Sequence, residues 1–180
     1  MSQFLVIKSS NDILPSQIDF VINFISSLGN NIHFFDLNEY SLHNVINNNE
    51  SPLVYTHIYI MAHGNDEVFS NNDSITHTWL DLAKLINDSG NFHDDTILIL
   101  KACDGGNINV AKTIFQNCDK IKYIYGLNGE QQNFDVFFSS ILFIYYIFWK
   151  EKTVEKSTEL SNKASELNAV CFDRDNFELN

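Results

Sequence analysis

The sequence predicts an α/β domain with a mainly parallel sheet of about five to six strands and helices on both faces. Short apolar runs typical of buried strands alternate with segments of helical periodicity. The runs are apolar along most of their length, as in parallel strands buried on both faces. The 180 residues are 44 % apolar and contain no Pro/Gly/Ser-rich linker, so residues 1–180 are expected to form a single domain.

The expected elements follow one another in order. Strands are predicted at residues 4–9, 31–37, 56–64, 95–103, 120–127 and 169–173, and helices at 15–29, 78–88, 107–117, 133–150 and 153–168. The first helix has Pro15 in its first turn and Gly29 as its stop. Residues 67–77 are typical of a small hairpin, and the asparagine-rich stretches 46–50 and 70–73 of surface loops.

One stretch, "VFFSSILFIYYIFW" at 136–149, resembles a membrane span in composition. It is only 14 residues long and holds two serines, whereas a spanning helix needs about 20 apolar residues. We therefore expect a buried core helix and no membrane span. Its apolar residues occur on nearly every side, so a partner is expected to cover whatever the sheet does not.

Charge and cysteine content exclude several classes of protein. With 23 acidic and 11 basic residues the net charge is −12, which disfavours nucleic acid and anionic membranes as partners. The N-terminus has no basic flank of a signal peptide, so a cytoplasmic location is expected. The three cysteines include no CxxC pair and are expected to be reduced. No tight His/Cys/Asp group predicts a metal site, and no cofactor is expected.

Two expected strands stop at a reactive side chain followed by glycine. His63 and Gly64 end "YIMAHG", and Cys103 ends "LILKAC" before Asp-Gly-Gly. If these strands are neighbours, both side chains reach the rim where α/β sheets bind ligands. An imidazole beside a thiol favours the thiolate and can protonate a leaving group. The glycine would let a bare amide approach, and with the amide of Cys103 it could hold an oxyanion.

Residue order separates the possible hydrolase classes. All six histidines precede Cys103, which excludes the papain-like and α/β-hydrolase orders with this nucleophile. His57 and His33 lie near the starts of their strands, far from the rim. His77, in the expected hairpin, is the alternative base to His63.

These motifs resemble the caspase-like cysteine peptidases. Their local signature is Q-A-C-[RQG]-G with a histidine about 50 residues upstream; here "ACDGG" follows His63, with Cys103 40 positions after it. The aromatic helix, basic turn and second helix over 133–168 look like the helix pair that closes the CHAT branch. The resemblance spans roughly residues 3–173. It implies a caspase/hemoglobinase-type fold, with His63 as general base and acid, Cys103 as nucleophile, and the amides of Gly64 and Cys103 as oxyanion hole.

The expected function is therefore a cysteine endopeptidase that cleaves a protein substrate through an acyl-enzyme, controlled by a regulatory protein partner or an upstream sensor. The candidate substrate-binding residues are Lys101, Lys8, Asp104 and Glu130. Two lysines converging on the pocket would favour an acidic side chain before the cleaved bond. In one alternative, Lys101 pairs with a local carboxylate such as Asp104 or Glu130 and touches no substrate. In another, acidic groups in the pocket favour a basic side chain, with Asp36, Asp66, Glu130 and Asp135 as candidates. A catalytically degenerate scaffold and a non-proteolytic α/β protein are the other possible functions.

Overall fold

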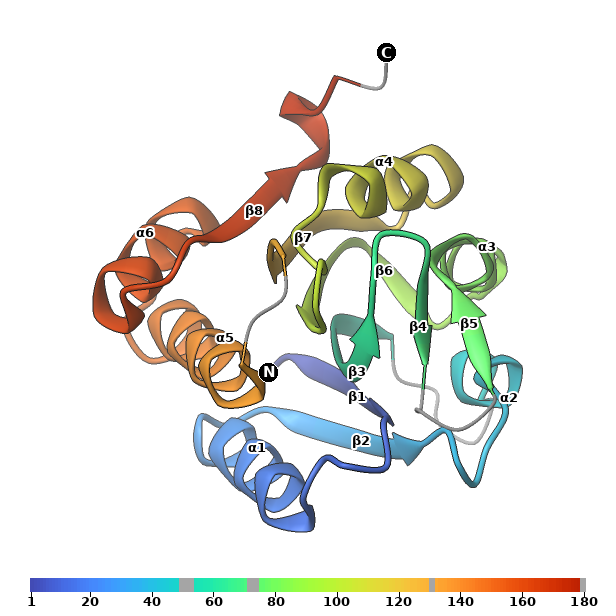
Figure 1. Cartoon of the computed structure of the whole chain (residues 1–180), viewed down its shortest axis with the longest axis horizontal. Helices are drawn as coiled ribbons and strands as arrows, with labels where there is room; N and C mark the ends of the chain where they lie inside the picture. Colours follow the sequence, from blue (N-terminus) through green and yellow to red (C-terminus); the bar gives the residue numbers. More distant parts are fainter. Residues whose placement is uncertain (49–53, 71–74, 130–131, 179–180) are drawn as a thin grey trace.

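A mixed sheet of eight strands forms the centre of the computed structural model, which describes residues 1–48, 54–70, 75–129 and 132–178 (Figure 1). In its main path the order is β2-β1-β3-β6-β7-β8. These strands are β1 (Gln3–Ser9), β2 (Asn31–Asp36), β3 (Tyr55–Gly64), β6 (Phe92–Lys101), β7 (Ile121–Leu127) and β8 (Ala169–Asp173). Neighbours pair in parallel except β8, which is antiparallel to β7. The predicted α/β class with a mainly parallel sheet is confirmed.

A short hairpin extends the end of β3. Its strands are β4 (Val68–Ser70) and β5 (Thr76–Thr78), which pair in antiparallel fashion. β4 also pairs with β3, where His63 faces Ser70 and Gly64 faces Phe69. The hairpin predicted over 67–77 is therefore present in its two strands, and it fixes the backbone at His63.

Helices cover both faces of the sheet (Figure 1). One face carries α1 (Pro15–Ser27), α5 (Asn133–Phe148) and α6 (Val154–Ser165), and the other α2 (Leu42–Ile46), α3 (Trp79–Asp88) and α4 (Ile108–Asn117). A 3₁₀ turn, Arg174–Asn176, follows β8. Side chains alternate along each strand, so the continuous apolar run of β1 serves both cores: Phe4 and Val6 face α1 and α5, while Leu5 and Ile7 face the other helices.

Local signals explain where several helices begin and end. The hydroxyl of Thr78 accepts a hydrogen bond from the amide of Asp81 at the start of α3, and the amide side chain of Asn107 does the same for Asn109 in α4. Gly29, with φ of 80°, follows the end of α1, as the sequence predicts. These caps set where α3 and α4 begin.

The helix α2 was not predicted from the sequence. It has only five residues, too few for a periodic pattern, yet Leu42, Val45 and Ile46 are buried against the core. The stretch 46–50, predicted as a surface loop, therefore begins inside a helix, and the stretch 70–73 begins in β4. Residues 49–50 and 71–73 lie outside the described part of the chain.

The aromatic stretch forms α5, a core helix as predicted. Phe143 and Ile144 are fully buried in the core between this helix and the sheet, while Phe134 and Phe138 near its start are exposed. Within the described residues, no helix has the combination of length and apolar character that crossing a membrane requires. The second helix of the predicted pair, α6, packs beside α5 and β8.

Candidate active site

The ends of β1, β3 and β6 meet at one edge of the sheet because these strands are parallel neighbours. The last paired residues of β3 and β6 are Met61 and Lys101. His63 and Cys103 each lie two residues beyond that pair, so the register alone brings them to the same level of the rim. The predicted adjacency of the two strands is confirmed, with β6 itself ending two residues before Cys103.

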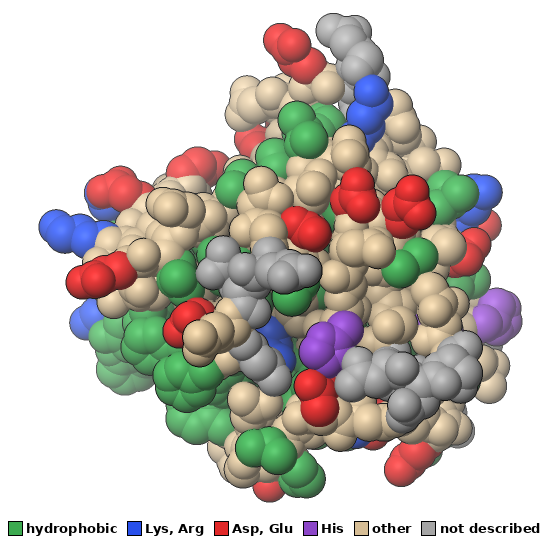
Figure 2. Space-filling view, viewed as in Figure 1, with side chains coloured by type: hydrophobic (Ala, Val, Ile, Leu, Met, Phe, Trp, Pro, Cys, Tyr) green, Lys and Arg blue, Asp and Glu red, His purple; other side chains and the backbone are tan. Residues whose placement is uncertain are grey.

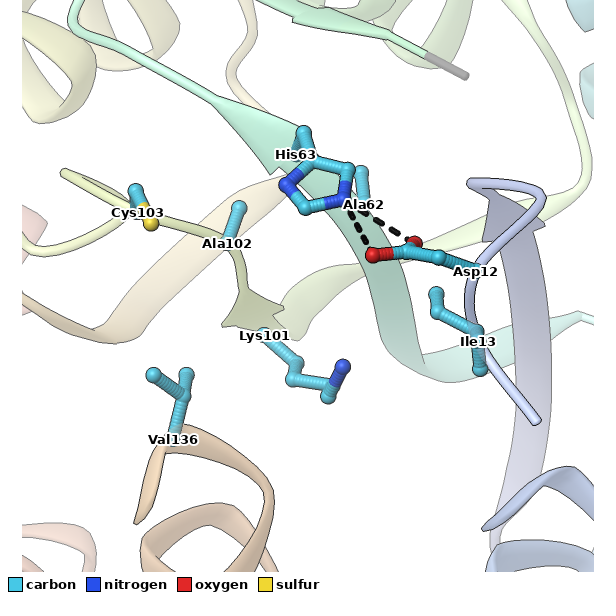
Figure 3. Close-up of a pocket in the computed structure, with 8 residues that line it drawn as sticks. All are labelled: Asp12, Ile13, Ala62, His63, Lys101, Ala102, Cys103 and Val136. Atoms are coloured by element: carbon cyan, nitrogen blue, oxygen red, sulfur yellow. Dashed lines mark hydrogen bonds and ion pairs between the residues drawn. The ribbon is translucent and has the colours of Figure 1, made fainter. Parts of the chain in front are cut away.

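A small cavity of about 120 Å³ lies at this edge (Figure 3). It is lined by eight described residues: Asp12, Ile13, Ala62, His63, Lys101, Ala102, Cys103 and Val136. They come from the segment after β1, the ends of β3 and β6, and the start of α5. The cavity thus joins the predicted histidine and cysteine with a carboxylate and an ammonium group.

The ring of His63 is held by Asp12. Its Nε2 lies 2.9 Å from each oxygen of the Asp12 carboxylate, and both side chains are about half-exposed. Within the described residues, the His63 ring forms hydrogen bonds with Asp12 and none with the Cys103 thiol. Figure 3 shows Asp12 and Cys103 on opposite sides of the ring. Nδ1 is therefore the ring nitrogen left for chemistry with the thiol or a substrate.

The surroundings of the Asp12 carboxyl group favour its ionised form. Burial acts to raise the pKa of this carboxyl, but hydrogen bonds from Ser10 and His63, together with the charge of His63, outweigh burial and lower it. The next residue, Ile13, is buried in the core and anchors the segment that carries the carboxylate. An ionised carboxylate in this position orients the His63 ring and stabilises the charge the ring gains with a second proton.

The turn that carries Cys103 explains the Asp-Gly-Gly sequence. Asp104 has φ of 56°, and its carboxylate accepts a hydrogen bond from the amide of Gly129 at 2.8 Å. A Cβ on Gly106 would lie 2.5 Å from the carbonyl oxygen of Gly126, and one on Gly105 would also collide with β6. The two glycines let the turn press against β7 and so set the position of the half-exposed Cys103 thiol.

Gly64 has a similar role on the neighbouring strand. A Cβ at this position would lie 3.0 Å from the carbonyl oxygen of Val68 and 3.4 Å from that of Cys103. Glycine therefore permits the close approach of the two rim segments. The backbone of Gly64 therefore lies next to that of Cys103.

Lys101 is the cation of the cavity. The residue is 3 % exposed, and burial lowers the pKa of its ammonium group to about 8, while the charges of Asp12 and Cys103 act in the opposite direction. Figure 3 shows the side chain inside the cavity with its nitrogen on the side of Asp12. Asp12 is therefore a carboxylate of the described cavity lining whose charge acts on Lys101.

Other predicted substrate-binding residues lie elsewhere. The ammonium of Lys8 is 2.6 Å from the carboxylate of Asp36 on β2, and Lys8 is not among the described residues that line the cavity. The expectation that Lys8 and Lys101 converge on one pocket is therefore corrected: β1 does neighbour β3, but Asp36 on the same face of β2 holds the Lys8 side chain. The carboxylate of Asp104 accepts a hydrogen bond from the backbone, and Asp104 is not among the described residues that line the cavity. Glu130 lies outside the described residues.

The remaining candidate bases do not reach the cavity. His57 is buried between aromatic rings, His33 contacts the hydroxyl of Tyr55, and His77 packs against Phe69. His63 is the histidine of the described cavity lining, in agreement with the sequence analysis. In the described part of the chain, no group of three or more His, Cys, Asp and Glu side chains is arranged to hold a metal ion.

Sequence reasoning missed Asp12. A signal was present, because a carboxylate follows the first strand by three residues and that strand was expected to neighbour the third. The carboxyl ends of neighbouring parallel strands share a rim, so Asp12 belonged among the candidates together with His63. The direction of the loop after β1, however, is set by tertiary packing.

A family model matches part of the chain. The family model described as "Domain of unknown function (DUF8616)" matches residues 30–121, which make up half of the chain. The matched segment runs from the start of β2 to the start of β7 and includes both His63 and Cys103, whereas Asp12 and α5 lie outside it. No curated protein matches the chain.

Proposed function

The chain belongs to the DUF8616 domain family, and we propose that it is a caspase-like cysteine endopeptidase similar to the CHAT branch. One observation carries the proposal: a free cysteine and a carboxylate-bound histidine each lie two residues beyond the last paired positions of neighbouring strands and line one cavity. This set of groups suits nucleophilic catalysis, in which a base activates a thiol and a third group orients the base.

The reaction uses three side chains. The Cys103 thiolate attacks the scissile carbonyl carbon and forms a tetrahedral intermediate. His63 then gives its proton to the leaving amine as the C–N bond breaks, which leaves a thioester on the cysteine. The imidazole next takes a proton from water, and the resulting hydroxide attacks the thioester carbonyl carbon. The C–S bond then breaks, which releases the acid product and restores the Cys103 thiolate beside the protonated His63. Asp12 keeps the ring oriented throughout, and the thiol and ring close to hydrogen-bonding distance when substrate binds.

Backbone amides stabilise the intermediate. The amides of Gly64 and Cys103 are proposed as the oxyanion donors, supported by the close approach of these two segments. Donors held in place before the reaction need no reorganisation, and one such donor contributes about 10²–10³ in rate in a related type of site. No cofactor or metal takes part in the proposed reaction.

Lys101 is proposed to favour an acidic side chain before the cleaved bond. Its ammonium lies in the cavity within two residues of the nucleophile in sequence. An ion pair with a substrate carboxylate in this partly enclosed place would add about 1.5–3 kcal/mol, even though Asp12 already faces the same cation. The lysine acts alone in this role, because Lys8 is held by Asp36.

The setting of the enzyme is proposed to be the cytoplasm, with a regulatory protein partner. The three cysteines Cys103, Cys118 and Cys171 are free, as is usual in the reducing cytosol. The net charge of −12 disfavours nucleic acid, so the proposed partners are proteins and peptides.

Labelling with a cysteine-directed peptidyl electrophile, followed by mass spectrometry of the modified residue, tests the proposal. We expect adducts on Cys103 and slower labelling in His63→Ala. Cys118 and Cys171 serve as internal controls, because burial raises the pKa of both thiols, that of Cys171 to about 12. Equal labelling of all three cysteines in the folded protein would refute the assignment. An unreactive Cys103 in a chain that still binds a protein partner would favour the scaffold function.

A further inference from the structure

An apolar groove lies beside the candidate active site, between α1 and α5. Its described lining includes Phe20, Phe134, Phe137, Phe138 and Ile141, and its volume is about 360 Å³. We call it the aromatic groove. Figure 2 shows hydrophobic side chains gathered on the part of the surface where Figure 1 places these two helices.

The rings of the groove are exposed and yet ordered by one another. Phe20, Phe134 and Phe138 are 50 %, 65 % and 43 % exposed. Phe134 and Phe138 stack at 6.3 Å between ring centroids, and Phe20 meets the buried Phe137 edge-on at 5.7 Å. Exposed apolar patches with polar surroundings mark binding surfaces, and preformed ones lose little entropy when they bind.

The groove and the catalytic cavity are lined by neighbouring residues of the same two segments. Val136 lines the catalytic cavity, and the next residue, Phe137, lines the groove. On the opposite wall, Asp12 and Ile13 line the cavity, while Ser16, in the first turn of α1, lines the groove. A peptide that lies across Cys103 and runs on along these two segments would reach the groove.

Charge and size favour a peptide over the other possible occupants. The carboxylates of Asp12, Asp19 and Asp135 lie on the same two segments, and the chain carries a net charge of −12. A second copy or an anionic membrane would bring like charge to this surface. A stable interface between two copies also needs about 800 Å² on each partner, whereas this groove has the dimensions of a few side chains.

We propose that the aromatic groove binds a large apolar side chain of the peptide substrate, located within a few residues of the cleaved bond. This inference rests on the proposed endopeptidase function and names a feature of its substrates. The phenylalanine rings would enclose a Phe, Leu or Met side chain and hold the peptide in line with Cys103. The groove thus sets a second specificity, separate from any contact with Lys101.

A peptide library randomised on both sides of the cleaved bond tests the proposal. We expect one position to select Phe, Leu or Met, and the double variant Phe134→Asn/Phe138→Asn to lower kcat/KM for those peptides about tenfold or more. The same variant should change little for peptides with alanine at that position. Trp149→Asn is the matched control, since Trp149 is 61 % exposed at the other end of α5 and outside the groove. Unchanged thermal unfolding would show that the exposed substitutions leave the fold intact.

Binding separates failure of the groove from failure of the peptidase. Fluorescence anisotropy with the same peptides and the Cys103→Ala chain reports the groove without cleavage. Cleavage with no apolar preference, or a preference that survives the double variant, overturns the groove proposal alone. Binding that needs the phenylalanines without cleavage by the wild type overturns the peptidase alone. If the peptides are neither bound nor cleaved, both proposals are overturned. A dimer or binding to phosphatidylcholine vesicles that the double variant abolishes would assign the groove to another occupant.

Discussion

We expect His57 to make the fold sensitive to mild acid. The ring is 7 % exposed and lies between Phe4 and Phe148, with centroid distances of 4.5 and 5.0 Å. Its Nδ1 contacts the hydroxyl of Thr56, while its Nε2 has no hydrogen-bond partner among the described residues. Burial lowers the pKa of the ring from 6.5 to about 3.

The sign and size of the effect follow from proton linkage. At neutral pH the ring is mostly uncharged in both the folded and the unfolded chain. As the pH falls below 6.5, only the unfolded chain takes up the proton, so the free energy of unfolding decreases. Each pH unit is worth about 1.4 kcal/mol, so the loss from His57 reaches about 2 kcal/mol at about pH 5. It continues to grow until the pH approaches about 3, where the folded chain is protonated as well.

Urea denaturation at about pH 7 and about pH 5 measures this loss. The wild type should lose about 2 kcal/mol more between the two pH values than His57→Gln, which cannot take up a proton in this range. The comparison is made across pH within each variant, so a lower stability of His57→Gln at neutral pH does not affect it. His43→Gln, at an exposed position, should behave as the wild type does. Equal losses in the wild type and His57→Gln would refute the reasoning.

Three further outcomes are expected. Gly106→Ala should lower the free energy of unfolding by about 1–3 kcal/mol, because its Cβ meets the backbone of β7, whereas Gly90→Ala, with open space around it, should change it little. Phe143→Ala, at a fully buried site, should cost about 3–5 kcal/mol in urea denaturation, against less than about 1 kcal/mol for the exposed Phe138→Ala. The preference for an acidic side chain, measured as a ratio of kcat/KM values, should fall as pH rises through about 8, where Lys101 loses its charge. A flat ratio across that pH range would argue against Lys101.

The strands and most helices could be predicted because their signals are local. A run such as "FLVIKS" begins with four consecutive apolar residues, which suits a short strand covered on both faces. The same kind of pattern ended in His63 and in Cys103, so the rim position of both residues followed from the prediction of a parallel sheet. The helix α2 was not predicted, because five residues are too few to show a periodic pattern. Its burial also depends on contact with α3, which lies far along the chain.

The amino-acid sequence alone thus determined the α/β class, the expected strands and the two residues at the rim. These features depend on apolar periodicity and on strand ends, which are visible within a few neighbouring positions. Tertiary structure alone decided which charged groups meet. Asp12 reaches His63 across 51 positions, and Lys8 turns to Asp36 while Lys101 stays in the cavity. These contacts depend on strand order, register and the course of loops, and such long-range geometry arises only when the packed core brings distant segments together.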